Sequence, residues 1–139
     1  MALTADDHLA IHELVSWHGH LFDNGELDRL GELFTSDIVY DASEFTGEPI
    51  PGIDEDMRIA AVAGGAVALG DRNPLGHHVT NIVVTGKTDS EAEVRSKGIG
   101  VMTDGRSVTV TYEDIVVRTS DGWRIRHRKL IPRRKPLTR

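Results

Sequence analysis

The chain contains no cysteine. This absence excludes a disulfide framework, a thiolate metal site and a cysteine nucleophile. Long apolar runs are also missing, and no segment approaches the length of a membrane-spanning helix. The N-terminus, MALTADDHLAIHEL, has acidic residues and histidines where a signal peptide needs a basic start and an apolar run. A cytoplasmic location is therefore the default expectation.

Positive charge is scarce relative to negative charge. The 139 residues include 16 lysines and arginines against 22 aspartates and glutamates, which gives a formal net charge of -6 and a pI near 5.6. Non-specific nucleic-acid binding rests on clustered cations. We accordingly expect no nucleic-acid partner, and the lack of a membrane-spanning segment leads us to expect no membrane partner. Basic residues crowd the C-terminal end, where a solvated strand face and tail is the ordinary explanation.

The sequence also lacks motifs for cofactors and for a nucleophile. The run Gly98-Ile99-Gly100 has no third glycine and lies inside a predicted strand, and no serine nucleophile elbow occurs. His8 and His12 are four residues apart, as two ligands on one helix face would be, but His18 and His20 cannot share that face. We expect no cofactor and no metal, which leaves proton transfer as the leading enzymatic chemistry.

The first part of the chain has helical patterns. Thr4 and Asp7 form a capping-box-like start, and apolar residues then recur over a broad face until the C-cap signal Asn24-Gly25. A second, short helix is predicted over Glu26 to Phe34, and a strand-like run over Ile38 to Tyr40. An alanine-rich third helix follows after an irregular stretch.

That stretch, Asp41 to Gly52, carries two prolines and two glycines, which oppose regular hydrogen bonding. It also carries Phe45 and Ile50, which gain little by staying in water. We expect it to form a mobile edge of a pocket mouth that closes over bound ligand. The third helix is predicted over Ile53 to Leu69.

The remainder of the chain is rich in valine, isoleucine and threonine and predicts four strands. Turn residues separate them, as antiparallel connections require. The strands are expected at His77 to Thr85, Glu91 to Met102, Ser107 to Thr119 and Trp123 to Ile131. Helices followed by an antiparallel meander indicate a single α+β domain over residues 1–139. A long twisted sheet curls, so its concave side should form a pocket.

Four stretches together resemble the SnoaL-like, nuclear-transport-factor-2-like superfamily, which includes polyketide cyclases and scytalone dehydratase. They are Phe22 to Leu30, Leu33 to Asp37, His77 to Asn81 and Arg118 to Ile125. The resemblance implies a cone-shaped α+β barrel with a curved antiparallel sheet and three N-terminal helices around an apolar pocket. The same cone hosts unrelated chemistries and non-catalytic members.

The resemblance to scytalone dehydratase also implies a site. Asp23 falls on that enzyme's helix-1 aspartate, and His78 falls on the histidine at the start of its first long strand. A carboxylate that holds one imidazole nitrogen leaves the other free for proton transfer. Lys97 stands where a second catalytic histidine would be, and Glu113 lies close to a pocket asparagine. Because Phe22 and Ala42 replace tyrosines as well, scytalone is a poor substrate guess.

We therefore expect Asp23 and His78 to be the acid/base pair, with Lys97 and Glu113 as polar support. The substrate-binding residues are expected to be Trp17, His20, Phe22, Tyr40, Phe45, Val62, Tyr112 and His127. Which of His77 and His78 faces the pocket stays open, because neighbouring strand residues point to opposite faces. If Lys97 faces inward, it could stabilise an enolate oxygen.

The predicted function is a cofactor-independent lyase, isomerase or cyclase acting on a small apolar oxygenated molecule. Two alternatives stay open: a non-catalytic binding or subunit module, and an epoxide hydrolase that would use Asp23, Lys97 and Glu113 to activate water. The strand from Ser107 to Thr119 carries apolar groups on both faces. One-sided burial would leave an exposed patch, so we also expect a homodimer formed through the convex face of the sheet.

Overall fold

The computed structural model describes residues 2–46 and 58–137. It opens with helix α1 (Ala5–Asp23), which has the predicted capping box between Thr4 and Asp7 and ends at the C-cap Asn24. A hydrogen bond from the backbone N–H of Thr4 and another from Arg118 lower the pKa of Asp7 to about 2. Because Arg118 lies on the sheet, the same carboxylate caps the helix and ties its first turn to the sheet.

Short elements follow. The predicted second helix is a 3₁₀ helix, η1 (Leu27–Glu32), and the first strand, β1 (Phe34–Asp41), is longer than its sequence pattern indicated. Part of the predicted irregular stretch forms a short helix, α2 (Ser43–Thr46), while residues 47–57 lie outside the described part of the chain. The third helix, α3, is described over Arg58–Leu69 and is followed by the 3₁₀ turn η3 (Gly70–Arg72).

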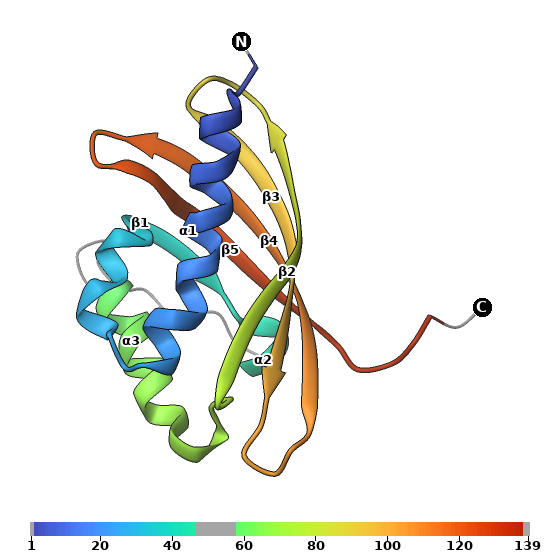
Figure 1. The fold of residues 1–139 in the computed structure, drawn as a ribbon. Helices are drawn as coiled ribbons and strands as arrows, with labels where there is room; N and C mark the ends of the chain where they lie inside the picture. The colour runs from blue at the N-terminus through green and yellow to red at the C-terminus, as the bar shows by residue number, and fades with distance from the viewer. Residues whose placement is uncertain (1, 47–57, 138–139) are drawn as a thin grey trace.

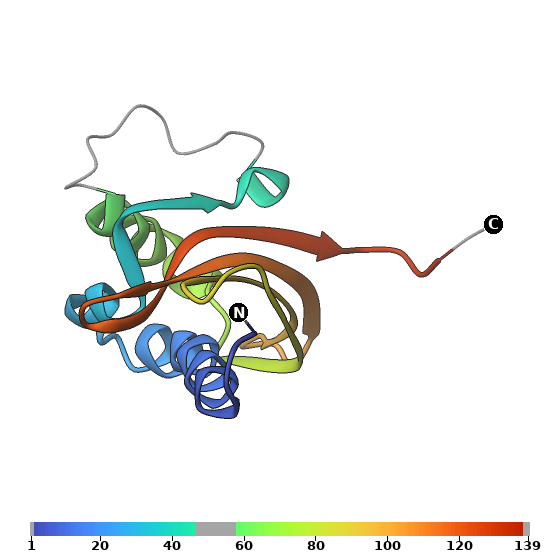
Figure 2. The ribbon, with the colours of Figure 1, turned by 90° about the horizontal axis from the view of Figure 1, so that it is seen from above.

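The four predicted strands form an antiparallel meander. They are β2 (Gly76–Gly86), β3 (Glu91–Val101), β4 (Ser107–Thr119) and β5 (Gly122–Arg133). Strand β1 joins the edge of this meander by pairing with β5 in parallel, which gives the sheet order β1-β5-β4-β3-β2. Figure 2 shows the sheet curling around an interior that α1 and α3 close from one side.

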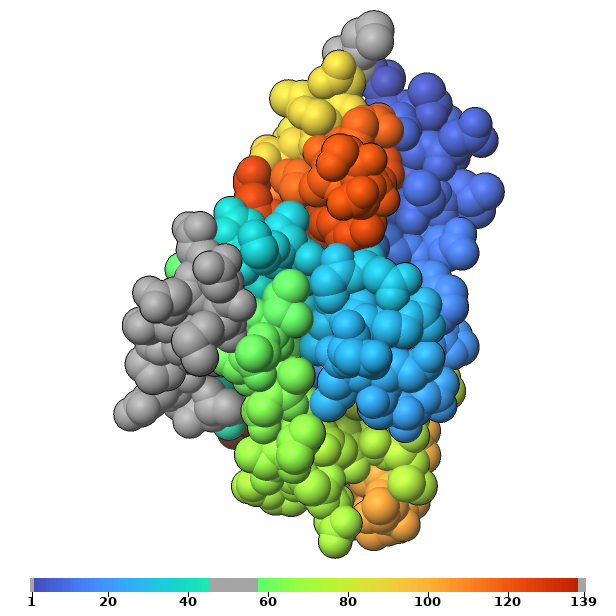
Figure 3. All heavy atoms as spheres, turned by 90° about the vertical axis from the view of Figure 1, so that its left-hand side faces the viewer, coloured from blue at the N-terminus to red at the C-terminus, as the bar shows by residue number. Residues whose placement is uncertain are grey.

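Helix α1 lies across the concave face of the sheet and runs alongside β2 (Figure 1). Helix α3 and η1 lie side by side next to it (Figure 3). The core between them is apolar and is centred on fully buried residues of α1, η1, β1 and β5, among them Ile11, Leu30, Phe34 and Ile125. No helix in the described residues is long and apolar enough to cross a membrane.

Two β-bulges decide which side chains reach the interior. In β2, Thr80 pairs with Lys97 and Val83 pairs with Arg95, so two residues of β2 oppose one of β3. Asn81, with a φ of 54°, lies at this bulge. The extra residue reverses the alternation of faces, so His77 shares the inner face with the apolar residues beyond the bulge.

The second bulge is in β5. Ile115 pairs with His127 and Val116 pairs with Ile125, so Arg126 is the extra residue. Beyond it, Arg128 points inward and is 1% exposed. Both bulges therefore change which polar side chains face the interior.

Candidate functional site

Asp23 and His77 form a hydrogen-bonded pair at the rim of the interior. The Nδ1 atom of His77 lies 2.6 Å from Oδ1 of Asp23, and the backbone N–H of His77 donates to Oδ2 over 2.9 Å. Each side chain is 21% exposed, so the pair is mostly buried but still in contact with water. A carboxylate can only accept hydrogen bonds, so in the neutral imidazole the proton is held on Nδ1 and the lone pair is left on Nε2. Nε2 makes no hydrogen bond to any residue that the structure describes.

Helix α1 brings this pair together because it packs closely on β2 at Gly19. A Cβ on Gly19 would collide with the backbone carbonyl oxygen of His77. The absence of a side chain therefore lets the last turn of the helix approach the strand. Asp23, one turn further along α1, then reaches the backbone and ring of His77.

His18 lies at the centre of an aromatic cluster deeper inside. Its ring stacks on Phe22 at 4.3 Å between centroids and meets His77 edge-on at 5.4 Å. Nε2 of His18 lies 3.4 Å from the hydroxyl of Tyr40, and its ring lies 5.7 Å from that of Tyr112. Burial, and then the charges of Arg128 and His77, lower the pKa of His18 well below its ordinary value. His18 is therefore a neutral imidazole near neutral pH.

Arg128 and Asp114 form a buried ion pair in the interior. Nε and Nη2 of Arg128 donate to the two carboxylate oxygens of Asp114 over 2.7 and 2.8 Å. The guanidinium carbon also lies 4.3 Å from the ring centroid of Tyr112, within the range of a cation–π contact. Burial raises the pKa of the Tyr112 and Tyr40 hydroxyls, so both are protonated near neutral pH.

Three of the four residues expected to carry the chemistry lie elsewhere. The predicted Asp23–His78 pair is wrong: His78 is exposed, because the bulge at Asn81 puts His77 rather than His78 on the inner face. Lys97 is exposed on the outer face. Glu113 also lies on that face and pairs with Arg95 at 3.4 Å. Asp23 alone of the expected epoxide-hydrolase set of Asp23, Lys97 and Glu113 reaches the interior rim, so that set is not assembled.

The expected substrate-binding residues divide into two groups. Phe22, Tyr40, Val62 and Tyr112 belong to the interior or pack against the core. The other four do not line it, and the reason differs from one to the next.

Trp17 is 39% exposed and His20 is exposed, and the two contact each other on the outer side of α1. The guanidinium carbon of Arg29 also lies over the Trp17 ring, 5.1 Å from its centroid. Phe45, on α2, is 48% exposed. His127 lies on the outer face of the sheet, because the bulge at Arg126 shifts the alternation along β5.

The residues that sequence reasoning missed are His77 as the partner of Asp23, His18, Arg128 and Asp114. The sequence does contain a signal for the last two residues. Arg128 and Asp114 each lie in the middle of a predicted strand that also carries apolar residues. The signal is ambiguous, because a charged strand residue usually faces water. His18 occurs among apolar helix residues, but its role depends on the strands that meet it.

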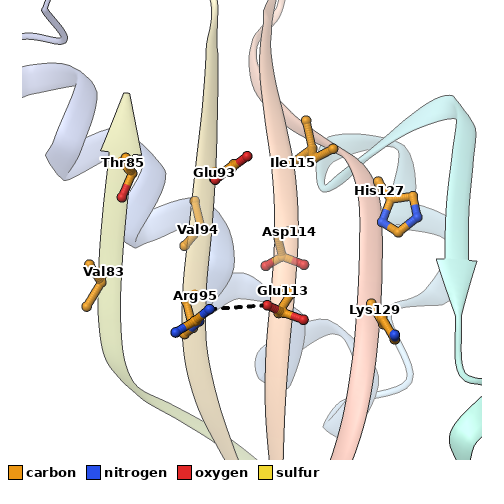
Figure 4. Close-up of a pocket in the computed structure, with 10 residues that line it drawn as sticks. All are labelled: Val83, Thr85, Glu93, Val94, Arg95, Glu113, Asp114, Ile115, His127 and Lys129. Carbon is orange, nitrogen blue, oxygen red and sulfur yellow. Dashed lines mark hydrogen bonds and ion pairs between the residues drawn. The ribbon is translucent and has the colours of Figure 1, made fainter. Parts of the chain in front are cut away.

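A hollow lies away from this cluster, on the outer face of the sheet. It has a volume of about 570 Å³ and crosses β2, β3, β4 and β5 (Figure 4). Val83, Arg95, Glu113, His127 and Lys129 are among the residues that line it. The described residues contain no group of three or more histidines, aspartates or glutamates that could hold a metal ion.

The SnoaL-like domain family matches residues 3–129. The match covers most of the chain, and the protein therefore belongs to the SnoaL-like domain family. A search of curated protein sequences found no significant match.

Solved structures share the fold over nearly the whole chain. A proposed aromatic ring hydroxylase from Novosphingobium aromaticivorans is 29% identical, with a TM-score of 0.73 over 95% of this chain and 92% of that one. A protein of unknown function with a cystatin-like fold from Nostoc punctiforme is 21% identical, with a TM-score of 0.76 over 96% of each chain. A proposed scytalone dehydratase from Novosphingobium aromaticivorans is 22% identical, with a TM-score of 0.70 over 94% and 89%. The predicted nuclear-transport-factor-2-like α+β fold is thus confirmed.

Proposed function

We propose that the protein is a cofactor-independent acid/base catalyst, a lyase, isomerase or cyclase, that acts on a small apolar oxygenated molecule. The observation that carries the proposal is the 2.6 Å contact between Asp23 and Nδ1 of His77. It replaces the expected pair with His78 but keeps the chemistry, because a carboxylate still fixes the imidazole tautomer and leaves Nε2 as a base.

In this reaction Nε2 of His77 removes a proton from a carbon beside a carbonyl group, and the electron pair of that C–H bond moves toward the carbonyl oxygen. The imidazolium that forms is stabilised by Asp23. The proton is then returned to a different carbon, or to a hydroxyl that leaves as water. The first outcome is an isomerisation and the second is an elimination, and the same base serves both.

The surroundings of His77 support an apolar substrate. Phe22 lies 6.2 Å from the His77 ring between centroids, and the neutral His18 lies 5.4 Å away. Both side chains are uncharged, so an apolar substrate could pack against them without removing water from a charged group. The similarity in fold to a proposed scytalone dehydratase agrees with elimination chemistry in this family, although fold alone does not define a reaction.

The test is proton abstraction without a known substrate. We expect the protein to accelerate deuterium uptake from D₂O at the α-carbon of an apolar bicyclic ketone such as 2-tetralone, measured by NMR. His77→Ala and Asp23→Asn should each lower the rate by about 10²- to 10⁴-fold, the usual contribution of a positioned acid or base. His78→Ala is the matched control and should retain the native rate, because this neighbouring histidine is exposed.

Two results would contradict the proposal. One is a His78→Ala variant that loses exchange as fully as His77→Ala does. The other is a wild-type protein that exchanges none of a panel of mono- and bicyclic ketones faster than buffer, which would favour a non-catalytic binding module instead.

A further inference from the structure

A groove lies where α1, η1 and the first residues of β5 meet, on the face of the molecule that Figure 3 shows. Its volume is about 260 Å³. Sites for drug-sized ligands typically measure about 300–1,000 Å³, so this groove matches a smaller molecule with a single aromatic ring. Neither Asp23 nor His77 lines it, and the groove is therefore separate from the candidate site described above.

Apolar and aromatic side chains make up much of the groove. Leu14, Leu21 and Trp123 line it and are buried, whereas Trp17 also lines it and is 39% exposed. Trp123 is held in place, because its Nε1 lies 3.4 Å from Oδ1 of Asp7. Both tryptophans of the chain thus line the same groove. An aromatic ring bound here would pack against other aromatic rings, a contact that proteins use widely.

Arg29 lines the groove, but its charge is already balanced. Its guanidinium carbon lies over the Trp17 ring, and its Nε and Nη1 donate to Glu32 and Glu26 over 2.7 and 3.0 Å. The hydrogen bond from Arg29 is the main cause of the lowered pKa of Glu32, and the charge of Arg124 is the smallest. Arg29 therefore holds the tryptophan ring and is itself held by two carboxylates.

Two further groups of opposite charge line the groove without a charged partner. Arg124 donates from Nε to the carbonyl oxygen of Gly31 over 3.1 Å and from Nη1 to that of Trp123 over 2.9 Å. Its guanidinium is thus fixed in position, yet it makes no ion pair with any described residue. Glu13, on α1, is exposed and makes neither a hydrogen bond nor an ion pair with the described part of the chain. A fixed cation on β5 and an anion on α1 therefore border one apolar space.

We infer that this groove binds a free aromatic amino acid, with the ring against the tryptophans, the carboxylate on Arg124 and the ammonium group on Glu13. Among the described residues that line the groove, two arginines balance two glutamates, which favours a zwitterion over an anion or a cation. An aromatic residue at either end of a peptide lacks one of the two charged groups. The inference does not rest on the proposed function, because the two sites share no residue.

The fluorescence of the two tryptophans reports binding without a label, since both line the groove. We expect a saturable change in their emission when the full chain is titrated with phenylalanine. Phenylpropionate, which lacks the ammonium group, and phenethylamine, which lacks the carboxylate, should each bind about 10-fold more weakly, because each loses one charged hydrogen bond. Alanine, which lacks the ring, should give no saturable change over the same concentrations.

Two variants assign the charged groups. Arg124→Gln should weaken phenylalanine binding about 10-fold and leave phenethylamine binding unchanged, because that amine has no carboxylate to lose. Glu13→Gln should weaken phenylalanine binding similarly and leave phenylpropionate binding unchanged. Arg72→Gln is the matched control, since Arg72 is exposed on η3 and does not line the groove.

Each outcome decides the inference. It is overturned if the wild-type emission does not change saturably, or if phenylalanine binds no more tightly than phenylpropionate and phenethylamine. A loss that is equal for all three probes in either variant also overturns it, because the charges would then act on the fold and not on the ligand. If Arg124→Gln does not fold, Glu13→Gln and the wild-type analogue series still give the answer. Asp23→Asn should bind phenylalanine with native affinity, so this site and the proposed base are tested independently.

Discussion

At the scale of single residues, the interior depends on His18 remaining uncharged. This imidazole is 4% exposed, stacks on Phe22 and contacts the hydroxyl of Tyr40. Protonating it would place a second positive charge in the interior that already holds Arg128. The arrangement of the site is thus tied to the protonation state of one residue that does not perform the proposed proton transfer.

A pH dependence of stability follows from the lowered pKa of His18. In the unfolded chain this histidine binds a proton near pH 6.5, whereas in the folded chain it does so only at much lower pH. The unfolded state therefore binds more protons below pH 6.5, so the free energy of unfolding is unaffected by His18 above that pH and falls as the pH decreases, by at most about 1.4 kcal/mol per pH unit.

Urea unfolding at a series of pH values measures this loss. His18→Phe should flatten the slope below pH 6.5, while His20→Phe, on the exposed side of the same helix, should leave it unchanged. An identical slope in the wild type and in His18→Phe would show that other groups cause the acid sensitivity.

At the scale of elements, the contact between α1 and β2 assembles the site. Gly19 allows the helix backbone to touch the strand at His77, and Asp23 spans the remaining distance. The other end of the helix is tied to the sheet by Asp7, which accepts a hydrogen bond from Arg118 at 2.8 Å. The helix is thereby fixed at both ends against the concave face.

Two glycine-to-alanine substitutions in helices should have opposite effects. Gly19→Ala places a methyl group against the His77 carbonyl, and overpacking of this kind costs about 1–3 kcal/mol. Gly64→Ala in α3 meets nothing within 4 Å, so the helix propensity of alanine should stabilise the protein by up to about 1 kcal/mol.

Thermal unfolding measures both changes, and deuterium exchange should decrease only for Gly19→Ala. A Gly19→Ala variant with native stability and rate would mean that the helix can move away from the strand without consequence for the site.

At the scale of the whole molecule, the outer face of the sheet remains open. Val83 is 60% exposed and Ile99 is 40% exposed on this face, beside the hollow of about 570 Å³. The face carries both charge signs, with Glu93 and Glu113 near Arg95. In a twofold dimer the same patch meets itself, so a surface with both signs can be complementary to its own copy.

We accordingly propose that a second copy of the chain covers this face, and light scattering at micromolar concentration should give the mass of a dimer. Val83→Glu should shift the mass toward the monomer by burying an unpaired charge. Val67→Glu is the control, because Val67 is 68% exposed and lies on α3 rather than on a strand of the sheet. A monomeric wild type, or an equal response to both substitutions, would refute this interface.

The sequence by itself determined most of the elements and their order. The capping box at Thr4 and the four strands after Gly76 were predicted within a few residues, because caps, turns and β-branched runs are local signals. The class of the fold followed from that order together with the family resemblance. Asp23 was also placed correctly at the end of the first helix.

Only the tertiary structure decided which side chains face inward. A bulge adds one residue to a strand, and with a side-chain period of two this reverses every position beyond it, a change that the local pattern does not show. For that reason His77, and not the predicted His78, faces the interior. In the same way Arg128 faces the interior and the predicted His127 does not. Arg128 could be buried only because Asp114 and Tyr112 meet it from the neighbouring strand, a contact that exists only once the strands have paired.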